Sequence, residues 1–128
     1  MSLTSTALVA EDNDFVRMQM VKFLKDAGYQ VKEAIDGTGA IDSVAEKDVD
    51  IAIVDVRMQP VDGFGFIKTI RGKNIDIPVI LVTGDNNPDL LEQAQLWHVG
   101  AVLIKPVQKD RLLKTVERTL AAYRKRAS

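Results

Sequence analysis

Five polar residues in this sequence end or follow short apolar runs, and their types suit phosphate and metal chemistry. They are Glu11, Asp12, Asp55, Thr83 and Lys105. Carboxylate oxygens are the ligands that Mg²⁺ prefers, with coordination positions left for water and phosphate oxygens. An ammonium and a hydroxyl can hold the oxygens of a phosphate group. Asp55 closes the most hydrophobic segment of the chain, which makes it the candidate nucleophile.

Three carboxylates in one place require compensation. Two unit charges about 4 Å apart repel by roughly 4 kcal/mol at an effective dielectric constant near 20. Such a cluster is unfavourable unless a cation or the ammonium of Lys105 offsets the repulsion. The residue types therefore predict a cation-dependent site, provided that the fold brings these positions together.

Short apolar runs supply the strands that would carry these residues. Four of them are uniformly apolar, as in strands buried on both faces of a parallel sheet. These runs are residues 7–10, 51–54, 78–82 and 101–104. Residues 29–34 alternate more and are predicted to form an edge strand.

Helical patterns lie between the strands. The first has one apolar face, formed by Val16, Met20, Phe23, Leu24 and Ala27, with Gly28 as its C-terminal cap. Asp36 is expected to cap a second helix that runs to about Lys47.

Three further helices complete the pattern. A third is predicted at residues 63–71, and a fourth at 90–97 with Asn87 and Pro88 at its start. The last helix presents Leu113, Val116 and Leu120 inward and ends in the basic residues 124–126.

Strand and helix thus alternate five times, with connections that require crossovers. Right-handed crossovers give an α/β fold, an open parallel sheet with helices on both faces. Ligands bind such sheets outside the carboxyl ends of the strands. All five polar residues lie at those ends, so the fold is expected to gather them on one rim.

Composition narrows the class of protein. The chain has 128 residues, 46% hydrophobic and 27% charged, which suits a single globular domain. A net charge of −1 gives no general attraction to nucleic acid or anionic membranes. There is no cysteine, so disulfides and thiolate metal sites are excluded and a cytoplasmic location is expected. No apolar run approaches a membrane span.

Two rival functions fit the residues less well. A flavin or dinucleotide site needs a glycine- or hydroxyl-rich phosphate cradle after the first strand, whereas the segment EDND at residues 11–14 would repel phosphate. A haloacid-dehalogenase-like phosphatase needs a second acid two residues after its nucleophile, and Arg57 stands there.

Four segments together resemble the receiver domain of bacterial two-component response regulators. They are LVAEDN, IVDVRMQPVDG, VILVTG and VLIKPV, in that order. The resemblance extends from about Ala7 to Tyr123. It implies a flavodoxin-like fold, a single five-stranded parallel sheet in the order 2-1-3-4-5.

The resemblance also implies roles for the rim residues. Asp55 would accept a phosphoryl group from a sensor histidine kinase or a phosphotransfer protein. Mg²⁺, or Mn²⁺, would be held by Glu11, Asp12, Asp55 and the backbone carbonyl of Arg57. Thr83 and Lys105 would bind phosphoryl oxygens, and the Lys105–Pro106 peptide bond would be cis. The protein would catalyse only its own phosphorylation and dephosphorylation, and would signal through its fourth helix, fifth strand and fifth helix.

Some positions depart from the family pattern. Gln59–Pro60 replaces the usual Met-Pro step, Val102 stands in place of a switch tyrosine or phenylalanine, and His98 in place of a common glycine. We further hypothesise that Arg57 and Asp85, two residues after Asp55 and Thr83, form an ion pair that covers the pocket and slows the entry of water.

Alternatives and boundaries complete the expectations. A phosphorylation-independent pseudo-receiver, a protein-interaction module, is the main alternative. We expect residues 1–5 to be a tail or a cloning remnant, 6–124 the receiver domain, and 125–128 a basic tail or the start of a linker. An output domain after the chain, and nucleic-acid contact only through it, would fit the resemblance, which also admits a homodimer. No membrane partner is expected.

Overall fold

Strand and helix alternate along the whole chain, as predicted. The structure is a computed structural model that describes residues 5–46, 48–85 and 87–127. The predicted tail up to residue 4, the predicted helix end at Lys47 and residue 128 lie outside the described residues. In chain order the elements are β1 Thr6–Ala10, α1 Asp14–Asp26, β2 Gln30–Ala34, α2 Gly37–Ala45, β3 Ile51–Asp55, α3 Gly63–Gly72, β4 Val79–Thr83, α4 Pro88–Leu96, β5 Ala101–Ile104 and α5 Lys109–Ala127.

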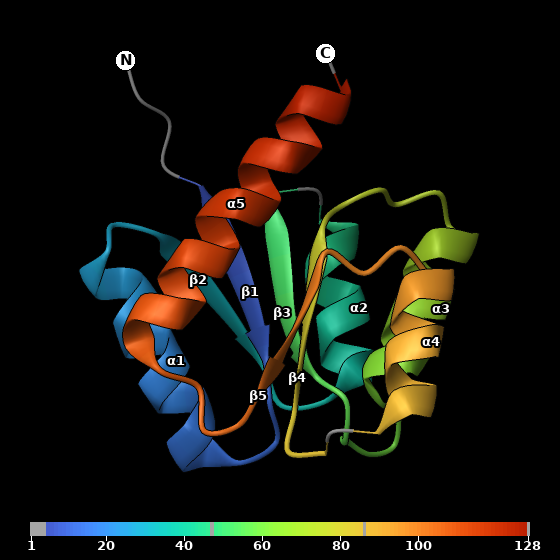
Figure 1. Cartoon of the computed structure of the whole chain (residues 1–128), viewed down its shortest axis with the longest axis horizontal. Coiled ribbons are helices and arrows are strands. Elements are labelled where there is room, and N and C mark those ends of the chain that lie inside the picture. The colour runs from blue at the N-terminus through green and yellow to red at the C-terminus, as the bar shows by residue number, and fades with distance from the viewer. Residues whose placement is uncertain (1–4, 47, 86, 128) are drawn as a thin grey trace.

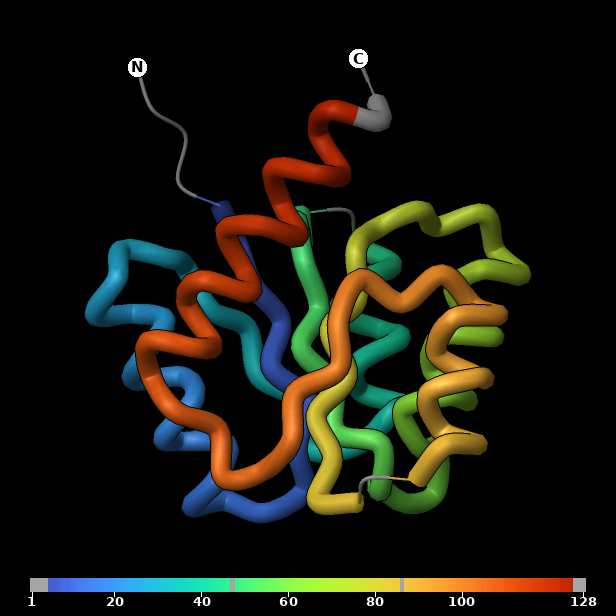
Figure 2. The backbone as a smooth tube through the Cα atoms, viewed as in Figure 1, coloured from blue at the N-terminus to red at the C-terminus, as the bar shows by residue number. Residues whose placement is uncertain are grey.

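The five strands form one parallel sheet in the order β2-β1-β3-β4-β5, which confirms the predicted flavodoxin-like fold (Figure 1). The strand order reverses between β1 and β3, and such a switch point is where open α/β sheets bind ligands. Figure 2 shows the loops that follow β1, β3, β4 and β5 along the lower edge of the molecule. Residues far apart in the sequence therefore meet at this edge.

Helices cover both faces of the sheet. The helices α1 and α5 lie on one face, and α2, α3 and α4 lie on the other (Figure 1). Side chains alternate between the two cores because successive residues of a strand point to opposite faces. In β1, Ala7 and Val9 join the core under α1 and α5, whereas Leu8 and Ala10 join the opposite core. Every residue of β1, β3 and β4 is buried, so the loops after these strands are firmly anchored.

Some predicted packing is wrong. β5 was expected to be buried on both faces, but it is a sheet edge, and Ile104 is 45% exposed. In α1 the core side chains are Met20, Val21 and Leu24, whereas Ala27 is an exposed C-cap. In α5 Val116 and Leu120 are buried as predicted, whereas Leu113 is only half-buried and Leu112, which was not predicted, is fully buried.

Polar caps fix the helix starts. Asp36 and Asn87 cap α2 and α4, as predicted. On the rim itself, Oδ1 of Asn13 accepts from Val16 N at 3.0 Å and Oδ1 of Asp62 accepts from Gly65 N at 2.8 Å. These caps satisfy backbone donors that would otherwise have no helical partner. They also set where the loops after β1 and β3 end.

No helix in the described ranges is both long and apolar enough to cross a bilayer.

Candidate functional site

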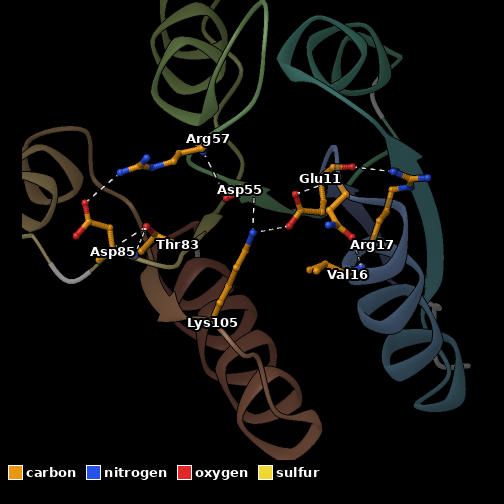
Figure 3. Close-up of polar contacts among 9 residues, drawn as sticks. Glu11, Val16, Arg17, Asp55, Arg57, Thr83, Asp85 and Lys105 are labelled. Carbon is orange, nitrogen blue, oxygen red and sulfur yellow. Dashed lines mark hydrogen bonds and ion pairs between the residues drawn. The ribbon is translucent and has the colours of Figure 1, made fainter.

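The ammonium of Lys105, just after β5, lies between two carboxylates (Figure 3). Its Nζ is 2.7 Å from Oε1 of Glu11 and 3.1 Å from Oδ2 of Asp55. The two acids come from the ends of β1 and β3, and the Lys105–Pro106 peptide bond is cis. One cation thus joins three strand ends at the rim.

Asp12 completes an acidic cluster with Glu11 and Asp55. Each of the three offers an oxygen, and these oxygens lie within 4.8 Å of one another. Glu11 is fully buried and Asp55 is 4% exposed, whereas Asp12 faces solvent. A buried side with two acids and an open side with a third suits a hard cation that keeps several water ligands.

Glu11 is held in an environment that favours its neutral form. Its Oε2 accepts a hydrogen bond from Asn13 N at 3.3 Å. Its Oε1 is buried and close to Lys105, but among the described residues no hydrogen bond of good geometry reaches this atom. Burial raises the pKa of Glu11 to about 7, and the neighbouring carboxyl of Asp55 adds to this rise while Lys105 opposes it. A buried carboxylate oxygen without a hydrogen bond, beside two more acids, is suited to bind a hard cation.

Lys105 and the backbone of Arg57 fix both oxygens of Asp55. Oδ2 accepts from Lys105 Nζ at 3.1 Å, and Oδ1 accepts from Arg57 N at 3.3 Å. Burial lowers the pKa of Lys105, but its contacts with the carboxylates of Glu11 and Asp55 outweigh burial and raise it above the ordinary value. Lys105 therefore remains an ammonium and balances part of the acidic charge.

Thr83 lies on the same rim but faces away from the acids. Its Oγ1 accepts from Asp85 N at 3.0 Å and lies 3.4 Å from Asp85 O (Figure 3). Within the described ranges, no hydrogen bond joins Thr83 to Asp55. The hydroxyl is tied to the loop after β4, so a rotation would be needed for it to reach a group on Asp55.

Arg57 and Asp85 form the ion pair that we hypothesised. Arg57 Nη2 lies 3.3 Å from Asp85 Oδ2, and the two side chains are 79% and 46% exposed. Arg57 borders two neighbouring hollows, one lined by Asp55 and Lys105 and the other by Asp12. Both partners of the pair line the hollow that contains Asp55 and Lys105.

Glycine at position 63 permits a close backbone approach behind Asp55. A Cβ at Gly63 would lie 2.6 Å from the backbone oxygen of Asp55, closer than real contacts allow. Gly63 N also donates to Val56 O at 3.0 Å. The first residue of α3 is thus packed directly on the end of β3. The loop between them contains a cis Gln59–Pro60 bond, whereas only the Lys105–Pro106 bond was predicted to be cis.

Two departures from the family pattern have simple structural settings. Val102 is partly buried and packs against the core under α2, α3 and α4. His98 has a φ of 55°, in the left-handed region that favours glycine. This conformation accounts for the glycine that is common in relatives at that position.

Arg17 was not singled out in the sequence, yet it contacts the loop that carries the acids (Figure 3). Its Nη1 donates to Glu11 O at 2.8 Å, its Nε to Glu33 Oε1 at 3.2 Å and its Nη2 to Asp14 Oδ1 at 2.6 Å. The spacing of Asp14 and Arg17 predicts a surface ion pair on a helix, but the contacts with Glu11 and Glu33 arise only in the folded chain.

Comparisons with known proteins agree with this geometry. The family model described as the response regulator receiver domain matches residues 7–117. The chain is 32% identical over 118 residues to the transcriptional regulatory protein PdtaR of Mycobacterium tuberculosis, covering 91% of this chain and 57% of that protein. It is 31% identical to the CAI-1 autoinducer sensor kinase/phosphatase CqsS of Vibrio cholerae, covering 85% of this chain and 16% of that protein.

Solved structures give the same result. The chemotaxis response regulator CheY4 of Vibrio cholerae superposes with a TM-score of 0.85 at 28% identity, covering 91% of this chain and 99% of that one. A DNA-binding response regulator of the LuxR family from Staphylococcus aureus gives a TM-score of 0.84 at 26% identity, covering 91% and 98%.

Proposed function

Since this chain belongs to the response regulator receiver domain family, we propose that Asp55 accepts a phosphoryl group from a sensor histidine kinase or a phosphotransfer protein. The observation that carries the proposal is the contact of Lys105 with both Glu11 and Asp55 at the carboxyl ends of three strands. This arrangement supplies an acceptor oxygen, an internal cation and an acidic cluster within one small volume.

We propose that Glu11, Asp12, Asp55 and the backbone carbonyl of Arg57 hold Mg²⁺, or Mn²⁺. The cluster geometry and the buried Oε1 of Glu11 support this assignment. When bound, the metal ion neutralises charge on the transferring phosphoryl group and orients its oxygens. The protein side chains supply the remaining chemistry.

In the transfer, an oxygen of Asp55 forms a bond to phosphorus as the bond from phosphorus to the donor imidazole nitrogen breaks. The imidazole leaves with that electron pair, and an acyl phosphate remains on Asp55. Lys105 is already within 3.1 Å of the acceptor carboxylate, so its ammonium can move with little displacement to a phosphoryl oxygen. Hydrolysis returns Asp55 to the free carboxylate, because water attacks phosphorus and the carboxylate leaves.

Thr83 couples the site to the surface. We propose that its hydroxyl leaves Asp85 and donates to a phosphoryl oxygen, which draws the loop after β4 inward. That movement biases the surface formed by α4, β5 and α5. Because Val102 has no aromatic ring to rotate, displacement of the loop and helix carries the signal.

The Arg57–Asp85 ion pair regulates the lifetime of the acyl phosphate in this proposal. Both partners line the hollow that contains Asp55 and Lys105, through which attacking water would enter. Both side chains are largely exposed, so the pair contributes at most about 1 kcal/mol. Its effect is on access rather than on stability.

The chain spans 57% of the length of PdtaR and 16% of that of CqsS. We propose a cytoplasmic kinase or phosphotransfer protein as phosphodonor. An output domain or a separate protein would read the α4-β5-α5 surface. Any contact with nucleic acid would be made by that output partner.

Acetyl phosphate with Mg²⁺ tests the proposal against its alternatives. Wild type should gain a single phosphoryl adduct, and Asp55→Asn should gain none. A pseudo-receiver would give no adduct that depends on Asp55. A phosphatase would continue to hydrolyse unrelated phosphate esters, which this domain should leave intact.

A further inference from the structure

Arg17 donates a hydrogen bond to the backbone of a proposed metal ligand rather than to a carboxylate of the acidic cluster. Its Nη1 donates to the carbonyl oxygen of Glu11 at 2.8 Å (Figure 3). We propose that Arg17 is a positioning residue, which holds the loop after β1 so that the carboxylates of Glu11 and Asp12 face the divalent cation. The inference rests on the proposed function, because the cation belongs to it.

The Glu11 backbone lies at the point where β1 stops being paired on both sides. Its N–H still donates to Ala34 O of β2 at 3.0 Å, whereas its carbonyl accepts from Arg17. A buried carbonyl left without a donor is costly. Arg17 thus fixes the peptide group that joins the Glu11 and Asp12 side chains.

The guanidinium is itself held in place from two further directions. It donates to Glu33 of β2 at 3.2 Å and to Asp14 of α1 at 2.6 Å. The Arg17 side chain is only 12% exposed, so it has little freedom to leave. A planar fork with several donors can serve three acceptors at once, and a lysine ammonium cannot match that geometry.

An electrostatic role and a positioning role for Arg17 predict opposite changes in the affinity for the divalent cation, so a measurement can separate them. Removing a positive charge near a cation site should strengthen cation binding if only the field of Arg17 matters. Loss of an anchor should instead weaken binding, because two ligands would no longer be fixed in place. Residues that orient metal ligands typically change metal affinity by about tenfold or more.

The experiment is a MgCl₂ titration of the whole chain, followed by the amide resonances of Asp12 and Arg57 in NMR spectra. Arg17→Met should raise the Kd for Mg²⁺ about tenfold, and Arg17→Lys should fall between wild type and Arg17→Met. The matched control is Lys22→Met, which removes the same charge and breaks an ion pair on the same helix, at 3.2 Å from Asp26. Its Kd should equal that of wild type.

Amide hydrogen exchange separates local positioning from general stability. In Arg17→Met the amide of Asn13, which bonds Oε2 of Glu11, should exchange faster, whereas the amides of β3 should keep their protection. An unchanged or lower Kd in Arg17→Met overturns the inference. If that variant does not fold, a wild-type Kd in Arg17→Lys overturns it instead. Failure of wild type to bind Mg²⁺ would overturn the proposed function, and this inference with it.

Discussion

The ammonium of Lys105 lies 2.7 Å from Oε1 of the fully buried Glu11, so an ion pair connects the ends of β5 and β1. The strands β3 and β4 lie between them in the sheet. Only a long side chain at the end of β5 can make this connection across the rim. Lys105 therefore acts as an internal counter-ion of the acidic cluster.

Replacing Lys105 should destabilise the protein more than an ordinary ion pair would suggest. Lys105→Met leaves Glu11 and Asp55 in a buried place without their cation, at a cost of about 2 kcal/mol near pH 8. Lys32→Met is a matched control, since its side chain is also 27% exposed and also pairs with two acids. Those acids are exposed, so Lys32→Met should lower the free energy of unfolding by less than about 1 kcal/mol. Urea unfolding measures both, and equal losses would contradict the prediction.

Stability without divalent cations should fall as the pH rises towards neutrality. Burial is the main cause that raises the pKa of Glu11 from 4.5 to about 7. The folded state therefore holds this proton more tightly than the unfolded chain does. The resulting stabilisation is complete below pH 4.5 and is lost as the pH rises through about 7. At about 1.4 kcal/mol per pH unit, the loss is on the order of 3 kcal/mol.

Urea unfolding in EDTA from pH 4 to 8, with wild type compared with Glu11→Gln, isolates this effect. The difference between the two curves should change across the interval, because glutamine does not titrate. Saturating Mg²⁺ should reduce the fall in wild type, since the cation replaces the proton. Parallel curves for the two proteins would exclude Glu11 as the titrating group.

The Arg57–Asp85 ion pair should lengthen the life of the acyl phosphate. Arg57→Ala opens the side from which water enters, so the half-life should shorten by up to about fivefold, the equivalent of 1 kcal/mol. Asp85→Asn should have a similar effect, and the double variant little more. Loss of radiolabelled phosphate from the protein gives the half-life.

The control for that experiment is Arg118→Ala, which removes an exposed arginine of α5 far along the chain from Asp55. Its half-life should match that of wild type. A half-life that is unchanged or longer in Arg57→Ala would remove the gating idea and leave the phosphoacceptor role intact.

Gly63 should be intolerant of even a methyl group. In Gly63→Ala the new Cβ would lie 2.6 Å from Asp55 O, so the end of β3 or the start of α3 must shift. Overpacking of this kind costs about 2 kcal/mol, and displacement of Asp55 should also slow its phosphorylation. Gly72→Ala, in the same helix with nothing within 4 Å of the new Cβ, is the control. It should be neutral or gain about 0.5 kcal/mol. Equal thermal unfolding of the two variants would contradict the prediction.

Much of the fold could be predicted from sequence because each buried strand is a short, uniformly apolar run. The sheet order came from the family resemblance, and the structure confirms it. Edge position was harder to predict. The segment Ala101–Ile104 is as apolar as the central strands, so its sequence does not mark it as an edge. Ile104 is exposed because no strand lies beyond β5 in the described sheet.

The candidate site was predictable in its residue types but not in its details. Strand ends that share a rim bring Glu11, Asp55 and Lys105 together, and this follows from parallel topology. The orientation of the Thr83 hydroxyl depends on the loop after β4 and has no sequence signal. Arg17 was missed because its decisive partner is a backbone carbonyl, which every residue possesses and no motif marks.

The central claim is that Asp55 is the phosphoacceptor of a cation-dependent cluster. The most direct measurement is to phosphorylate the chain with acetyl phosphate, reduce the acyl phosphate with borohydride, and map the modified residue by peptide mass spectrometry. We predict homoserine at position 55 alone, formed with Mg²⁺ and absent with EDTA. Modification at another residue, or none at Asp55 in the presence of Mg²⁺, would contradict the account.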